Sequence, residues 1–465
     1  MKKFFFVIGC CWLVAGSYGQ DVSQRLQKAY QLFEADSQLK HAVSSLYVID
    51  ANTGVVVVDK NAQVGLAPAS TQKIITSVTA FELLGKDYRY KTELGYTGDI
   101  IKETLNGDLF LQGSGDPTLG SWRYESTKDS IVLSKWSEMV KKTGIRNIKG
   151  AIVYNYKNFS ANVIPGGWIW QDIGNYYGAA PDVLNWKENQ YDILLKSGND
   201  IGSNVEILGN NSNYTNELKA AAKGTGDNAY VYLPSNNDNP LISGTIPINE
   251  KAFKITASDP FSIQHLLLSF GLALNRQGIR GKDLGSSTRY YMINQDKKSR
   301  KVNIIYTHYS PTLDSIIYWF NKKSINLYGE ALVKTFAYEK QGFGSTDSGV
   351  AIVKRFWKEK GLDEGELNMY DGSGLSPLNR VTTHAQVEIL KYAKTRDWYP
   401  YFYDALPEYN AMKMKSGTIS DVKGFCGYHK SKEGKEYIFS FLVNNYSGRS
   451  ADLVSKMYKV LNELK

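Results

Sequence analysis

The chain has 465 residues, of which 42% are hydrophobic and 22% are charged, a composition typical of a globular protein long enough for two or three domains. Its formal net charge is +9 at pH 7, but the lysines are distributed among acidic residues and form no basic arm. This pattern argues against a nucleic-acid-binding protein and leaves only a general attraction to carboxylate-bearing ligands.

The N-terminal residues have the features of a secretory signal. Two lysines precede an apolar stretch from Phe4 to Ala15, and the small residues Ser17 and Gly19 follow it. The apolar stretch is too short to span a membrane as a helix. We therefore predict a cleaved signal peptide over residues 1–19 and a periplasmic protein, with a lipoprotein anchored at Cys10 as the alternative.

The elements that follow predict an α/β domain. Residues 22–42 have the spacing of an amphipathic helix, and "SSLYVID" and "VVVVDK" are typical of two strands around an Asn-Thr-Gly turn. An apolar helical run then begins at Ser70. Beyond it, residues 93–256 consist mainly of short β-like runs separated by Gly, Asn, Ser and Asp.

Helical patterns return at residues 258–278, 312–342 and 346–361, and the chain closes with a strand over 436–446 and a helix over 450–465. We therefore expect one α/β domain built from residues 20–92 and 257–465. The β-rich residues 93–256 interrupt it as an insertion, which we expect to form two subdomains.

The motif S-x-x-K points to a nucleophilic serine with a lysine base, because residues three apart lie one turn apart on a helix. It occurs at Ser37, Ser70 and Ser420. Only Ser70 follows a proline-containing loop and opens a long apolar helix, so its hydroxyl can face out of a buried helix end. Lys73 must then have a lowered pKa, since a free lysine is protonated at neutral pH.

S-x-x-K joins S-D-N and K-T-G in the signature of penicillin-binding proteins and class A β-lactamases. The second motif has candidates at Ser197, Ser235 and Ser324, and the third has candidates at Lys142, Lys196 and Lys415. Only Lys415 follows the helical segments, in a strand-like stretch, while Ser324 lies in a loop between two helical patterns. These choices give the set Ser70, Lys73, Ser324, Asn326, Lys415, Ser416 and Gly417.

With these residues matched, the sequence resembles the penicillin-binding D-alanyl-D-alanine carboxypeptidases and endopeptidases with large inserted domains. Four further stretches, "GSGDPTL", "GWIWQDIGNYYGAAP", "SINLYGEALVK" and "DGSGLSPLNRVT", resemble that family's segments. The resemblance implies a serine β-lactamase/DD-peptidase-like fold, an antiparallel sheet with helices, split by the β-rich insertion. The sequence departs from the second motif at Ile325, where many relatives carry Asp.

The resemblance also implies a role for each residue. Ser70 attacks the carbonyl of the penultimate D-Ala, Lys73 is the base, and Ser324 or Lys415 passes a proton to the leaving D-Ala. Asn326 holds the peptide amide, and the terminal carboxylate is received by Lys415, Ser416, Gly417 and Thr418. The amides of Ser70 and Thr418 form the oxyanion hole, and Asp172 binds the free amine of the stem peptide's third residue.

The implied partners are peptidoglycan stem peptides, with β-lactam antibiotics as inhibitors and no nucleic acid. No cofactor or metal is expected, because the five histidines show no ligand spacing. One alternative is a β-lactamase of the same fold, since "EGELN" matches the E-x-x-L-N pattern at Glu364. The other is a binding protein that is acylated by β-lactams without turnover. Ser373 in "DGSGLS" is expected at most to line the site.

Overall fold

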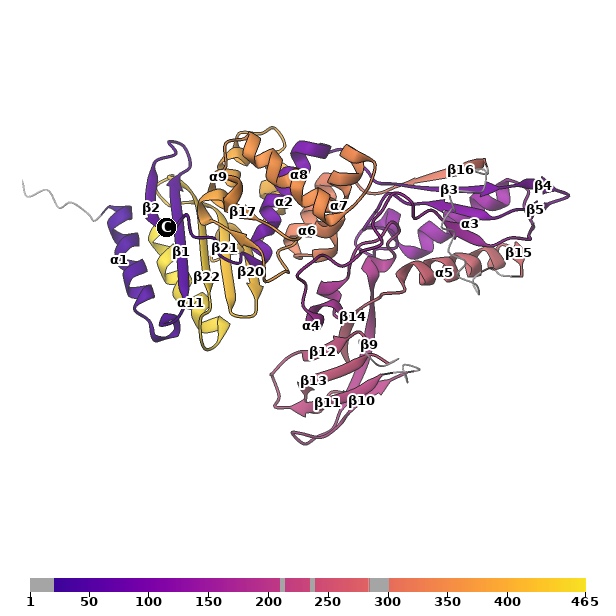
Figure 1. The fold of residues 1–465 in the computed structure, drawn as a ribbon. Coiled ribbons are helices and arrows are strands. Elements are labelled where there is room, and N and C mark those ends of the chain that lie inside the picture. Colours follow the sequence, from indigo (N-terminus) through magenta and orange to yellow (C-terminus); the bar gives the residue numbers. More distant parts are fainter. Residues whose placement is uncertain (1–20, 210–213, 235–238, 283, 285–300) are drawn as a thin grey trace, which may run out of the picture.

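The computed structural model describes residues 21–209, 214–234, 239–282, 284 and 301–465. The predicted signal peptide, Cys10 and the Ser235 motif lie outside these residues. Figure 1 shows a sheet covered by helices, a second mixed unit beside it and a small β unit that projects below. No helix among the described residues combines the length and the apolar character needed to cross a bilayer.

The main sheet joins the two ends of the chain. Its six antiparallel strands run in the order β19-β20-β21-β22-β1-β2. They are β1 (Val43–Asp50), β2 (Val56–Lys60), β19 (Glu408–Tyr409), β20 (Met412–Ile419), β21 (Val422–Lys430) and β22 (Glu436–Asn444). The strands predicted before Ser70 and at the C-terminus are confirmed, and they pair with each other as β1 and β22.

Helices cover both faces of this sheet (Figure 1). One face carries α1 (Val22–Glu34) and α11 (Ser450–Leu461). The other carries α2 (Lys73–Leu84) and α9 (Thr383–Lys394), backed by α6 (Leu313–Lys322), α7 (Asn326–Gln341), α8 (Thr346–Glu359) and α10 (Tyr399–Ala405). The first helix ends earlier than predicted, because the Asp36 carboxylate accepts the Gln38 amide and starts a separate 3-10 turn.

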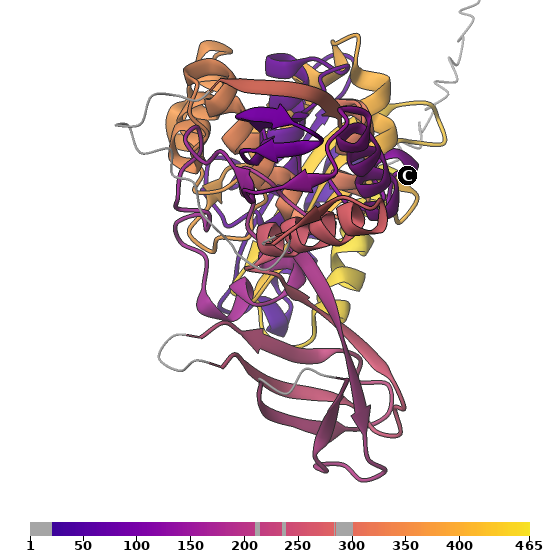
Figure 2. The same ribbon diagram turned by 90° about the vertical axis from the view of Figure 1, so that its right-hand side faces the viewer.

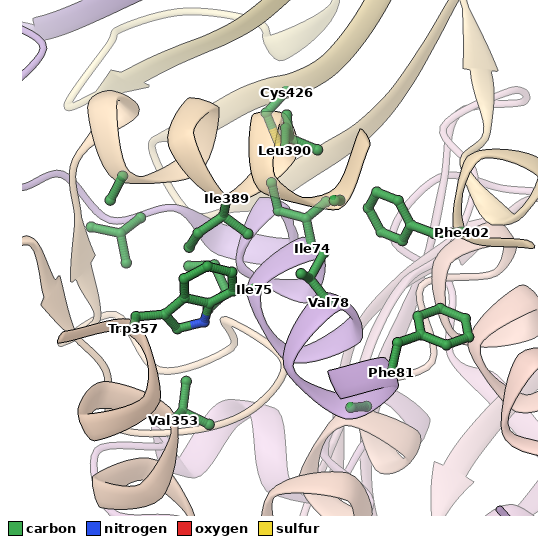
Figure 3. Packing of buried hydrophobic residues seen from close by; sticks show 14 of the residues in the cluster. Ile74, Ile75, Val78, Phe81, Val353, Trp357, Ile389, Leu390, Phe402 and Cys426 are labelled. Carbon is green, nitrogen blue, oxygen red and sulfur yellow. The ribbon is translucent and has the colours of Figure 1, made fainter. Parts of the chain in front are cut away.

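Helix α2 is enclosed on all sides. Every residue from Lys73 to Phe81 is buried, the polar side chains of Lys73, Thr76, Ser77 and Thr79 included. Figure 3 shows four of its side chains, Ile74, Ile75, Val78 and Phe81, surrounded by Val353 and Trp357 of α8, Ile389 and Leu390 of α9, Phe402 of α10 and Cys426 of β21. This packing fixes the position of Ser70 at the start of the helix.

The second unit contains two four-stranded sheets and two helices. Its strands are β3 (Lys91–Thr97), β4 (Asp99–Ile101), β5 (Thr104–Asn106), β6 (Leu109–Gln112), β7 (Asn147–Ile148), β8 (Ile152–Tyr154), β15 (Arg280–Gly281) and β16 (Val302–Tyr309). Helices α3 (Asp129–Lys142) and α5 (Ser262–Arg276) pack together through Trp136 and Phe270. The unit therefore extends past residue 256, where the sequence predicted the insertion to end, because β16 pairs with β3 and α5 shares its core.

The small β unit comprises β9 (Gln190–Ser197), β10 (Val205–Leu208), β11 (Thr215–Ala221), β12 (Asn228–Tyr232), β13 (Leu241–Pro247) and β14 (Phe253–Ser258). They form two three-stranded sheets around an apolar core that includes Ile193 and Ile246. Figures 1 and 2 both show this unit projecting from the rest of the molecule, below α4 (Trp170–Ile173). A two-stranded ladder, β17 (Leu367–Asn368) with β18 (Arg380–Val381), completes the strands.

Candidate active site

Ser70 and Lys73 lie on successive turns at the start of the buried helix. Ser70 belongs to the 3-10 turn Ala69–Gln72, which continues directly into α2 at Lys73. The Nζ atom of Lys73 is 2.9 Å from the Oγ atom of Ser70. The turn is tight enough to hold Ala69 at a φ of 47°. The two side chains are therefore in direct hydrogen-bond contact, as their spacing predicted.

The amine of Lys73 is buried among hydrogen-bond acceptors. Its Nζ atom donates to Asn326 Oδ1 at 2.6 Å and to the carbonyl of Ser373 at 2.8 Å. Burial, together with the nearby positive charge of Lys415, lowers the pKa of Lys73 well below its ordinary value. This shift favours the neutral amine, the form that can accept a proton from the adjacent hydroxyl.

Ser324 and Lys415 form the second contact pair of the site. Ser324 occupies the loop between α6 and α7, where its φ of 55° is unusual for a residue with a side chain. Its Oγ atom accepts a hydrogen bond of 2.9 Å from Lys415 Nζ, which also donates to the carbonyl of Ser416. Burial lowers the pKa of Lys415 to about 7.

Strand β20 brings the third motif against the turn that carries Ser70. A Cβ atom on Gly417 would lie 2.5 Å from the carbonyl oxygen of Pro68 and 2.9 Å from the amide nitrogen of Ser70. Only glycine permits this approach. Residues 416–418 pair with β21 on one side. On the other side the short strand β19 pairs only with Met412 and Lys413, so that edge of residues 416–418 borders the Ser70 turn.

Glu330 is a buried acid that the sequence analysis did not select. It lies one turn after Asn326 on α7, and its carboxylate accepts the backbone amides of Gly372 and Ser373 at 2.9 and 2.8 Å. These bonds hold the Ser373 carbonyl against Lys73. Burial and the charge of Asp371 raise the pKa of Glu330. The spacing of four from Asn326 was the available signal, because it places both side chains on one face of a helix.

Asp371 is the second acid that the sequence did not single out. Its side chain is fully buried and accepts hydrogen bonds from Gln72, Trp168, Asn379 and the amides of Gly374 and Ser376. It thereby ties the "DGSGLS" loop to the Ser70 turn and to the segment that carries Asp172. In the sequence this acid is indistinguishable from a turn residue, and only the fold shows that it organises the site.

Asp172 lies beside the cluster without touching it. The residue is in α4 (Figure 1) and is half-buried, and its carboxylate makes no hydrogen bond or ion pair with the described residues. Burial raises its pKa to about 6. Tyr177 links Asp172 to the site. Its carbonyl accepts a hydrogen bond of 2.7 Å from Asn326 Nδ2, and burial and the charge of Asp172 raise the pKa of its phenol.

The other motif candidates lie elsewhere in the molecule. The alternatives for the three motifs are placed in the 3-10 turn after α1 (Ser37), the β20–β21 turn (Ser420), the end of α3 (Lys142) and β9 (Lys196 and Ser197). Glu364 of the E-x-x-L-N pattern is exposed and forms an ion pair with Lys358. Among the described residues no group of three or more His, Cys, Asp or Glu side chains could hold a metal ion.

Comparison with known proteins agrees with this geometry. A model of the D-Ala-D-Ala carboxypeptidase 3 (S13) family matches residues 26–463, which is nearly the whole described chain. The chain belongs to this family. The resemblance predicted from the sequence is therefore confirmed, and the protein is a member of a family of serine peptidases.

Two proteins similar to this chain are D-alanyl-D-alanine carboxypeptidases. The one from Actinomadura sp. (strain R39) is 26% identical over 446 residues, covering 89% of this chain and 80% of its own. The one from Haemophilus influenzae, DacB, is 23% identical over 446 residues, covering 87% and 85%. A crystal structure of penicillin binding protein 4 from H. influenzae aligns with a TM-score of 0.76 at 21% identity, over 96% of this chain and 99% of the other. It confirms the predicted fold class.

Proposed function

We propose that this S13 family member hydrolyses the D-alanyl-D-alanine bond of peptidoglycan stem peptides through an acyl-enzyme on Ser70. The observation that carries the proposal is the contact between the Ser70 hydroxyl and the buried amine of Lys73. Family membership and the names of the two carboxypeptidase relatives support the choice of substrate. Cleavage of cross-links is the same reaction on a longer leaving group.

Acylation follows from the positions of the side chains. Lys73 takes the proton of Ser70 as Oγ bonds to the carbonyl carbon of the penultimate D-Ala. The amides of Ser70 and Thr418 donate to the developing oxyanion, which is supported by the close approach of β20 to the Ser70 turn. The C–N bond then breaks, and water hydrolyses the ester to regenerate Ser70.

Ser324 and Lys415 supply the proton for the leaving D-Ala. Lys415 Nζ donates to Ser324 Oγ at 2.9 Å, so a proton passed from Ser324 to the leaving amine can be replaced from Lys415. Lys415 also offers a cation to the terminal carboxylate, with Ser416, Gly417 and Thr418 on the same strand edge. Asn326, one side-chain contact from Lys73, is placed to hold the substrate amide.

Asp172 is our candidate for binding a free amine on the third residue of the stem peptide. Its carboxylate has no partner among the described residues, and burial raises its pKa because the charged form is poorly solvated. A bound ammonium group would stabilise that charged form. Asp172→Asn should lower kcat/KM about tenfold for a peptide with this amine free. The same peptide with the amine acetylated should be cleaved equally by both proteins.

A deacylating role for Glu364 finds no support, since its carboxylate is exposed and paired with Lys358.

The location and the domain division belong to the proposal. We propose export to the periplasm by a signal over residues 1–19. We also propose that the peptidase domain is interrupted by an insertion of two units that runs from residue 91 to about residue 310, because β3 and β16 enclose it.

The test is the intact mass of the mature protein with and without penicillin, followed over hours. The wild type and Ser37→Ala, a matched S-x-x-K control outside the site, should each gain one penicilloyl group, whereas Ser70→Ala should gain none. Release of D-alanine from a pentapeptide should require Ser70 in the same way. Rapid loss of the adduct with accumulation of hydrolysed drug would instead indicate a β-lactamase. An adduct without D-alanine release would indicate a binding protein, and no adduct would contradict the proposed nucleophile.

A further inference from the structure

A cavity of about 690 Å³ is lined by none of the active-site residues and takes no part in the mechanism above. It is lined by Trp122, Arg123, Tyr176, Lys187, Gln190, Tyr191, Asp192, Lys254 and Thr256. Its volume falls within the range of small-molecule sites. Tyr176 is adjacent in the chain to Tyr177, whose carbonyl accepts the hydrogen bond from Asn326, so one lining residue is joined directly to a residue that contacts the active-site cluster.

The charged side chains of the cavity are already neutralised by partners. Arg123 pairs with Glu188 at 2.7 Å. Lys187 pairs with Asp129 at 2.6 Å, and Lys254 pairs with Asp192 at 3.0 Å. No uncompensated cation is left to attract a phosphate or carboxylate. The lining therefore favours a neutral ligand that is rich in hydrogen-bonding groups.

Two aromatic rings are exposed to the cavity. Trp122 and Tyr176 are 52% and 55% exposed and both line the cavity, and the Arg123 guanidinium lies over the Trp122 ring at 5.4 Å from its centroid. Rings of this kind offer a flat apolar face beside polar groups. The C–H face of a pyranose sugar packs on such a ring, while its hydroxyl and acetamido groups bond to fixed polar side chains.

The segment Lys187–Asn189, which contributes Lys187 to the lining, is held in a fixed conformation. Lys187, Glu188 and the following Asn189 all have φ between 50° and 54°, a strained conformation that clusters at functional sites. The buried Glu188 carboxylate accepts hydrogen bonds from Ser121, Arg123 and Tyr328. Since Tyr328 is on α7, two residues after Asn326, this segment is anchored to the active-site helix.

We propose that this cavity binds an N-acetylated hexosamine of the glycan strand to which the stem peptide is attached. The inference rests on the proposed function for its link to the substrate. The chain itself supplies the link: Tyr176 lines the cavity, and the next residue is Tyr177. Burial and the nearby Asp172 carboxylate raise the pKa of Tyr177, and its carbonyl accepts a hydrogen bond from Asn326.

Direct binding tests the cavity independently of catalysis. Calorimetric titration uses the β-1,4-linked N-acetylglucosamine tetrasaccharide as the probe, on the wild type and on Ser70→Ala. Both should bind with the same Kd. Trp122→Ala and Tyr176→Ala should each weaken binding about tenfold, an effect of one lost stacking contact. Tyr309→Ala, a control of 50% exposure outside the cavity, should bind as the wild type does. Absence of saturable binding to the wild type overturns the proposal.

Kinetics then connect the cavity to the substrate. Trp122→Ala and Tyr176→Ala should lower kcat/KM about tenfold for a disaccharide-linked pentapeptide and leave it unchanged for the free pentapeptide. Equal losses on both substrates would overturn the proposal, because they indicate a structural role. If the wild type cleaves neither substrate, the proposed function fails, while the tetrasaccharide titration still decides whether the cavity binds sugar.

Discussion

The active-site cluster and the small β unit are built in opposite ways. Around Ser70 the side chains of Lys73, Lys415, Glu330 and Asp371 are charged or polar and buried, at nearly zero exposure. In the β unit the core contains apolar side chains such as Ile193, and its ion pairs lie at the surface. Burying charge is costly, so it is retained where chemistry needs it. Changes in the first region should therefore affect rate, and changes in the second should affect stability.

The largest effect should come from the buried lysine base. Lys73→Ala removes the group that accepts the Ser70 proton, and the rate of acylation by penicillin should fall about 10³-fold. Lys40→Ala, in the S-x-x-K motif that begins at Ser37, should acylate at the wild-type rate. Rapid mixing and quenching, followed by intact-mass measurement, gives the acylation rate of both variants. A loss of less than tenfold in Lys73→Ala would assign the base to another group and weaken the contrast between the two regions.

The second-largest effect on the acylation rate should come from a close backbone contact. Gly417→Ala places a methyl group against the carbonyl of Pro68 and the amide of Ser70, so β20 must move away from the oxyanion position. Acylation should slow about 10²-fold, a typical result of displacing an oxyanion-hole donor. Gly166→Ala is the control, because nothing lies within 4 Å of the added carbon. Equal rates for both variants would contradict the placement of Gly417.

The third effect is a pH dependence. Lys415 must be charged to hold the substrate carboxylate, and its pKa is about 7 in the free protein. The value of kcat/KM should therefore fall about tenfold per pH unit above neutrality. Bound carboxylate stabilises the cation, so the corresponding fall in kcat should occur at higher pH. In Lys415→Ala, kcat/KM should no longer show this fall above neutrality. A profile that stays flat from pH 6.5 to 9 in the wild type would contradict the assignment.

The sequence predicted the elements whose residues carry a local signal. The Ser70 helix, the Ser324 loop and the β20 strand were recognisable because each combines a motif with a periodic apolar pattern. Glu330 and Asp371 were not predicted as site residues, because their importance comes from burial and from the backbone amides that their carboxylates accept. A carboxylate looks the same in a sequence whether it faces solvent or organises a site.

The limits of the insertion were harder to predict for the same reason. Helix α5 and strand β16 both follow residue 256, yet their partners α3 and β3 precede it. Pairing of strands over such separations depends on tertiary contacts that composition does not reveal. The cavity lined by Tyr176 is a further case, since its lining comes from four separate stretches of the chain.

The smallest effect compares one methyl group in each region. Ile193 of the β unit and Ile74 of α2 are both fully buried, so Ile→Val costs about 1 kcal/mol of local stability at either position. In Ile193→Val, hydrogen exchange of the β9 amides should accelerate about fivefold while penicillin acylation stays within about twofold of wild type. In Ile74→Val the acylation rate should change as well, because the helix that carries Ser70 and Lys73 is repacked. Slower acylation in Ile193→Val would show that the β unit supports the site mechanically, and the two regions would then be one cooperative structure.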